Sequence, residues 1–160
     1  MTAASPPPEE TAAWQKRLAA QANNRAWRLS ESRSRAPAES EEMLHAAHAA
    51  MHLWSIVGTE NHRAHAALLL AHVHALLGNA DPATKYLAAC APHLSSPQRD
   101  AWEVALFHSV AAGVAAADQD DGAHRPHYAK ARQLIDALPD REDRDILQAT
   151  LAVVPTPHSG

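Results

Sequence analysis

Helix-ending and helix-starting residues divide this chain into seven segments of helical length. Gly58 and Gly78 each follow an apolar stretch, and glycine commonly ends a helix because it adopts a left-handed backbone without strain. Asp81-Pro82 and Ser96-Pro97 place a capping side chain directly before a proline, which is the order typical of a first helical turn. No segment alternates apolar and polar residues as a strand does. We therefore predict an all-α fold of about seven helices, over residues 9–29, 38–57, 59–78, 82–91, 97–117, 126–138 and 141–153.

The length and the alanine content indicate one domain. Hydrophobic residues make up 46% of the 160 residues, and many of them are alanine, the best helix former. A chain of this length can bury a core of its own. We expect a single helical domain over residues 9–154, a disordered proline-rich tail over residues 1–8 and a flexible tail over residues 155–160. The residues expected in the core include Trp14, Trp27, Trp54, Trp102 and Cys90.

Charge and cysteine content limit the classes of function. The formal net charge is −4 with neutral histidines, so the basic surface of a nucleic-acid-binding protein is not expected. One cysteine cannot form an internal disulfide, which fits a reducing compartment. The N-terminus does not read as a signal peptide, and no apolar run is long enough to span a bilayer. We therefore expect a cytoplasmic protein with neither nucleic-acid nor membrane partners.

A partial repeat motif appears in "LAHVHALLGNADPATKYLAACA". Small residues at fixed spacing allow helices to approach closely, and the central glycine allows the turn between them. The spacing is that of a tetratricopeptide repeat, with a histidine in place of the usual aromatic residue and a cysteine in place of an alanine. A weaker copy covers residues 102–138. We therefore expect antiparallel helical hairpins in a tetratricopeptide-like arrangement. The matching positions are Leu70, Ala71, His74, Gly78, Ala83, Leu87 and Cys90.

Several short motifs give the chain a family resemblance over roughly residues 38–150. They are Leu44-His45-Ala46-Ala47-His48-Ala49, Trp54, Gly58-Thr59-Glu60-Asn61, Val73-His74-Ala75-Leu76-Leu77-Gly78 and Glu142-Asp143-Arg144. In these motifs the chain resembles a family of uncharacterised bacterial tetratricopeptide-like proteins. The resemblance implies the fold rather than an activity. Members usually carry arginine and tyrosine where this chain has His72 and His74, so a site built on these histidines need not be shared.

Histidines are concentrated on two neighbouring predicted helices. At 100° per residue, His45, His48 and His52 fall on one face of the helix over residues 38–57. If the next helix pairs with it about Gly58-Thr59, His52 lies level with His65. The residue numbers of His45 and His72 add up to the same sum as those of His52 and His65, so this second pair also lies at one level along the two helices. We therefore predict that these histidines line one groove, from which His74 and Trp54 point away. The groove histidines are His45, His48, His52, His65 and His72.

Such a groove suggests two kinds of chemistry. Neutral imidazole is the commonest transition-metal ligand, and helical pairs three or four residues apart can chelate one ion. Zinc, copper or nickel would suit these ligands, and an alanine-lined groove with paired histidines could admit haem. Helix histidines also serve in hydrogen bonds or on a wet surface, with no ligand. The sequence leaves both interpretations open.

The leading functional interpretation is a non-enzymatic, tetratricopeptide-like interaction module that binds a peptide or protein partner or associates with itself. The alternative is a metal- or haem-binding helical protein that uses the histidine-lined groove. A third interpretation, an accessory enzyme with His45 or His48 as general base, identifies no reaction. Nucleophile-elbow, phosphate-loop and dinucleotide motifs are missing from the sequence, which favours the first.

Overall fold

The structure is a computed structural model that describes residues 7–158, and its regular elements are all α-helices. Within these residues there is no strand, which confirms the predicted all-α class and its seven helices. No helix in the described part combines the length and hydropathy needed to cross a membrane. The helices are α1 (Pro8–Ser30), α2 (Pro37–Val57), α3 (Glu60–Leu76), α4 (Ala80–Leu94), α5 (Ala101–Ala117), α6 (Asp121–Asp136) and α7 (Arg141–Ala152).

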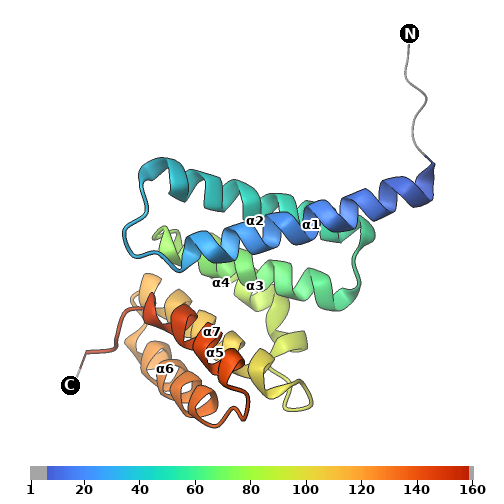
Figure 1. The fold of residues 1–160 in the computed structure, drawn as a ribbon. Helices are drawn as coiled ribbons and strands as arrows, with labels where there is room; N and C mark the ends of the chain where they lie inside the picture. The colour runs from blue at the N-terminus through green and yellow to red at the C-terminus, as the bar shows by residue number, and fades with distance from the viewer. Residues whose placement is uncertain (1–6, 159–160) are drawn as a thin grey trace.

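The helices pack in successive pairs (Figure 1). α1 contacts α2, α3 contacts α4 and α5 contacts α6, while α7 packs against α5 and α6. Figure 1 shows α1 and α2 above α3 and α4, with α5, α6 and α7 below them. The odd-numbered helices also contact one another in sequence order: α1 contacts α3, α3 contacts α5 and α5 contacts α7. One face of the molecule is therefore built from odd-numbered helices.

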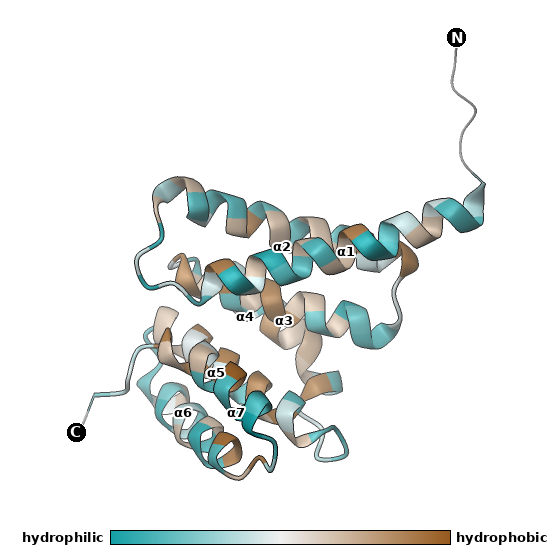
Figure 2. Ribbon diagram, in the orientation of Figure 1, coloured by the Kyte–Doolittle hydropathy of each residue, from teal (hydrophilic) through white to brown (hydrophobic). Residues whose placement is uncertain are grey.

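The core is built on α3 and α5. Both helices carry apolar residues around most of their circumference, and such helices are stable only when neighbours cover them on several sides. Figure 2 shows hydrophobic residues gathered on these two helices, whereas much of α1 and α6 is hydrophilic. α2 contributes a narrow buried face of small and flexible side chains. The buried residues of α2 are Met43, Ala47 and Ala50.

Several helix ends lie where local chemistry predicts them. Gly78 has a φ of 75°, and the amides of Gly78 and Asn79 bond back to the carbonyls of Ala75 and His74 at 3.1 and 2.9 Å. This is the Schellman motif, in which a left-handed residue ends a helix. Gly58 ends α2 in extended backbone, where an added Cβ would lie 2.5 Å from the carbonyl oxygen of Trp54.

The end of α5 uses the same motif with a less suitable residue. Gln119 has a φ of 58°, and the amides of Gln119 and Asp120 bond to the carbonyls of Ala116 and Ala115. A side chain is strained in this left-handed conformation, since its Cβ crowds the following carbonyl. Gln119 therefore occupies a position that glycine would fill at lower cost.

The predicted starts of α5 and α6 and the predicted end of α4 are wrong. α4 continues through Pro92 to Leu94, whose side chain is fully buried in the core, although proline removes one backbone hydrogen bond and crowds the preceding turn. α5 begins at Ala101 rather than at Pro97, after the amide of Asp100 donates to the Glu103 carboxylate at 3.3 Å.

Pro126 lies inside α6 rather than at its first turn. The Asp120 side chain accepts a hydrogen bond from the amide of Ala123 at 3.0 Å and so starts the helix five residues earlier. Asp140 caps α7 in the same way, with the amide of Asp143 at 2.9 Å, as predicted.

The predicted tails fall partly outside the described residues, which exclude 1–6 and 159–160. At the N-terminal side, Pro8 is the first residue of α1. At the C-terminal side, the carbonyl of Pro155 lies 2.8 Å from Nε2 of the buried His124. This contact attaches the segment after α7 to α6.

Candidate functional site

Tryptophan side chains line a groove formed mainly by odd-numbered helices, with one contribution from the end of α2. Trp27 comes from α1, Trp54 from the end of α2 and Trp102 from the start of α5, while Ile146 comes from α7. Three adjoining hollows share Trp27, and two of them share Trp102. We call this surface the aromatic groove, and we define it by Trp27, Trp54, Trp102, Leu106 and Ile146.

The expectation that all four tryptophans lie in the core is wrong. Trp102 is 38% exposed in the aromatic groove and Trp14 is 54% exposed on α1, while Trp27 and Trp54 are partly buried. An apolar helix face predicts burial only when another element covers it. Trp14 is covered only in part, by the Arg17 guanidinium of the same helix at 5.3 Å, and part of Trp102 stays in solvent.

Each groove tryptophan stacks on a histidine of α3. Trp54 lies over His62 with ring centroids 4.1 Å apart, and Trp102 lies over His65 at 5.6 Å. Trp27 lies over His72 at 5.3 Å. These contacts answer why α3 carries so many imidazoles. Its histidines support aromatic rings that come from three other helices.

A buried charge network holds the Trp102 end of the groove. Nε2 of His65 lies 2.8 Å from the Glu103 carboxylate, and the Arg99 guanidinium donates to the same oxygen at 2.8 Å. Burial raises the pKa of Glu103, but hydrogen bonds and positive charge from His65 and Arg99 outweigh it, so the pKa falls below its usual value. The ionised Glu103 fixes His65, and His65 fixes one face of Trp102.

His72 supports the Trp27 end without any polar partner. Its side chain has 0% exposure, and neither ring nitrogen has a hydrogen-bond partner in the structure. Burial, with a smaller contribution from the charge of Arg35, lowers the pKa of His72 to about 4. His72 is therefore a neutral ring at physiological pH, and it serves as a flat surface for Trp27.

The five histidines predicted to line one groove are not brought together. His45 and His52 are exposed on α2, because α2 packs through its small apolar face and leaves these imidazoles in solvent. His65 and His72 lie under different tryptophans. Among the described residues, no group of three or more histidine, cysteine, aspartate or glutamate side chains is placed to hold a metal ion. His45 is exposed whereas His72 is fully buried with no hydrogen-bond partner among the described residues, so the predicted pair makes no hydrogen bond.

His48 and His74 also differ from expectation. His74 was predicted to point away from the other histidines, yet its ring lies 5.7 Å from that of His48. It also stacks on Tyr86 of α4 at 5.8 Å, with 6° between the ring planes. Burial and the nearby His48 lower the pKa of His74. The helical wheel placed His74 on a different face of α3, but Tyr86 of α4 covers that face and His48, from the middle of α2, reaches it.

A close pair of histidines between α5 and α6 was not predicted from the sequence. Nδ1 of His108 lies 2.9 Å from Nδ1 of His127, a distance that requires one hydrogen between them. Burial, then the charges of His127 and Lys130, lower the pKa of His108 to about 4, and burial lowers that of His127. The rule of equal axial level did not find this pair, because its midpoint lies at the end of α5 whereas the next helix was predicted to begin only at Pro126.

Cys90 is a core residue, as predicted. It has no exposed surface, and burial raises the pKa of its thiol to about 12. Its Sγ donates to the carbonyl of Leu87 at 3.3 Å. A thiol held protonated in this way is a poor nucleophile and a poor metal ligand.

Comparison of the whole chain with protein-family models, curated proteins and solved structures found no match. The case for a function therefore depends on the aromatic groove and its supporting histidines.

Proposed function

We propose that this chain is a non-enzymatic, tetratricopeptide-like interaction module that binds a peptide in the aromatic groove. The observation that carries the proposal is that three tryptophans line one groove, where the side chain of Trp102 is 38% exposed. Tryptophan supplies large apolar contact area with little conformational entropy to lose, and it is enriched among the residues that dominate binding energy.

The packing order supports the tetratricopeptide-like part of the proposal. Paired helices stack so that α1, α3, α5 and α7 contact one another in sequence. A stack of this kind creates an extended surface on one face, as helical-repeat proteins use for their partners. The groove lies on that face, and Ile146 at its rim is 54% exposed. A cytoplasmic location and a peptide or protein partner remain parts of the same proposal.

The metal- or haem-binding alternative has less support. The five histidines first considered occupy separate environments, and His108 and His127 supply only two ligands. We therefore keep peptide binding as the single proposed function.

A selection from a random peptide library on the immobilised chain tests the proposal. The selected peptides should bind the original chain and the Trp14→Ala variant alike, because Trp14 is an exposed tryptophan outside the groove. They should lose most of their affinity for Trp102→Ala, whose helicity is checked by circular dichroism. Equal binding to Trp102→Ala and the original chain would refute the groove as the binding surface.

A further inference from the structure

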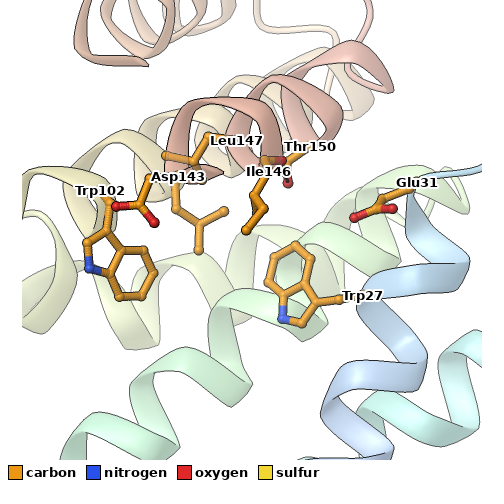
Figure 3. Close-up of a pocket in the computed structure, with 8 residues that line it drawn as sticks. Trp27, Glu31, Trp102, Asp143, Ile146, Leu147 and Thr150 are labelled. Atoms are coloured by element: carbon orange, nitrogen blue, oxygen red, sulfur yellow. Dashed lines mark hydrogen bonds between the residues drawn. The ribbon is translucent and has the colours of Figure 1, made fainter. Parts of the chain in front are cut away.

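One part of the aromatic groove combines tryptophan rings with carboxylates. It encloses about 260 Å³, with Trp27 and Trp102 on different sides and Leu106 and Leu147 among its apolar walls. Figure 3 shows the Asp143 carboxylate beside Trp102, with Ile146 lying between the two tryptophans. Glu31, at the end of α1, brings a second carboxylate to the Trp27 side.

The charged side chains that line this pocket are both acidic. Glu31 and Asp143 contribute two formal negative charges, and no lysine or arginine is among its lining residues. Neither side chain takes part in a salt bridge among the described residues, unlike Glu42 and Glu103, which pair with arginines. Arg28 lines the adjoining hollow rather than this one. The two carboxylates are therefore available to a positively charged ligand.

The indole rings favour the same ligand. The face of an indole carries negative potential and attracts ammonium and guanidinium groups. His65 covers one face of Trp102, which leaves the opposite face for a ligand. The buried His72 and the network of His65 with Glu103 hold the two tryptophans in place before any ligand arrives, and this preorganisation lowers the entropic cost of binding.

Size points to one side chain rather than a whole cofactor. The volume of about 260 Å³ is below the range of roughly 300–1,000 Å³ that is typical of sites for drug-sized ligands. Lysine and arginine combine a long apolar stem with a charged head, so the stem can lie along Leu106 and Ile146 while the head meets a carboxylate at one side of the pocket.

We propose that the pocket between Trp27 and Trp102 selects a lysine or arginine side chain of the bound peptide, with Glu31 and Asp143 as its charge partners. This inference rests on the proposed function, because it names the class of peptide that the aromatic groove binds. A peptide that presents a glutamate or aspartate at this position is repelled by both carboxylates.

Three peptides of the form Ac-Ala-Leu-Xaa-Leu-Ala-NH₂ test the selectivity, with lysine, acetyl-lysine or glutamate at Xaa. Acetylation keeps the stem and removes the charge. Binding is followed by the indole N–H signals in two-dimensional NMR, which are assigned with single tryptophan substitutions. The lysine peptide should shift the signals of Trp27 and Trp102 and bind about tenfold more tightly than the acetyl-lysine peptide. The glutamate peptide should bind more weakly than either.

Two double variants distinguish the effect of the pocket carboxylates from the effect of the apolar groove. Glu31→Gln together with Asp143→Asn should abolish the preference for lysine and leave the acetyl-lysine peptide unaffected. Glu9→Gln together with Glu10→Gln, exposed on the first turn of α1, is the matched control and should keep the preference.

Equal affinity for lysine and acetyl-lysine peptides, or no saturable binding of the lysine peptide, would overturn the inference. The peptide-binding proposal is decided separately, by whether library peptides depend on Trp102. If they do while the lysine preference is absent, the groove binds peptides of another class.

Discussion

The buried, unpartnered imidazole of His72 makes a quantitative prediction about stability in acid. Its pKa is about 4 in the folded chain, against an ordinary value of about 6.5. Between these values the unfolded chain binds a proton at this position and the folded chain does not. Stability from this residue is therefore fully present above about pH 6.5, and it is lost as the pH falls toward 4.

The size of the effect follows from the two pKa values. A complete shift of this kind corresponds to roughly 3 kcal/mol, at 1.36 kcal/mol for each pKa unit. At about pH 4.5 the folded ring is still mostly neutral, so the loss relative to about pH 7.5 is roughly 2–3 kcal/mol. Because His72 has no exposed surface, solvent screening reduces this figure less than it would for a surface histidine.

Urea unfolding of the original chain and of His72→Phe at several pH values provides the assay. Phenylalanine keeps a ring under Trp27 and cannot take up a proton, and a neighbouring cavity of about 170 Å³ leaves space for it. The variant should lose roughly 2–3 kcal/mol less than the original chain between about pH 7.5 and about pH 4.5. His45→Phe, an equivalent change at an exposed position of α2, should follow the original chain. An identical acid loss in His72→Phe and the original chain would refute the reasoning.

Three further predictions follow from other positions. Gln119→Gly should raise the free energy of unfolding by about 1 kcal/mol, because glycine relieves the left-handed strain; a thermal scan showing no increase would contradict this. Leu68→Ala should cost about 2–5 kcal/mol in urea unfolding, since Leu68 is fully buried in the core, whereas the exposed Ile146→Ala should cost far less. The ring protons of His108 should titrate with a midpoint near pH 4 in NMR, and His127→Ala should raise that midpoint; a midpoint already near 6.5 in the original chain would show that the pair does not form.

Local chemistry explains which parts of the fold were predictable. The end of α3 at Gly78 and the cap of α7 at Asp140 depend on contacts within a few residues, so the sequence contains what decides them. The start of α6 was misplaced because Pro126 and Asp120 are both legitimate starting signals. The helix uses the earlier one, since Asp120 caps it and proline costs only one hydrogen bond further along.

The candidate site was less predictable, because its contacts join distant helices. The helical wheel placed His45, His48 and His52 on one face of α2, and the buried residues of this helix, Met43 and Ala47 among them, are other ones. The wheel did not show which neighbouring helix packs against which face. The side chain of His72 was therefore predicted to face α2, although it lies under Trp27 of α1. Trp102 was assigned to the core for the same reason.

The histidines of α3 have a consequence for how uniquely the chain folds. Each of the four rings on this helix meets an aromatic ring from a different helix, namely α2, α5, α1 and α4. A one-residue slip of α3 rotates its side chains by about 100° and would separate all four ring pairs at once. In an alanine-rich bundle, small side chains alone would make a shifted register only slightly less stable. Here a shifted register loses several ring contacts together. The histidines of α3 thus specify a single register of this helix against its neighbours.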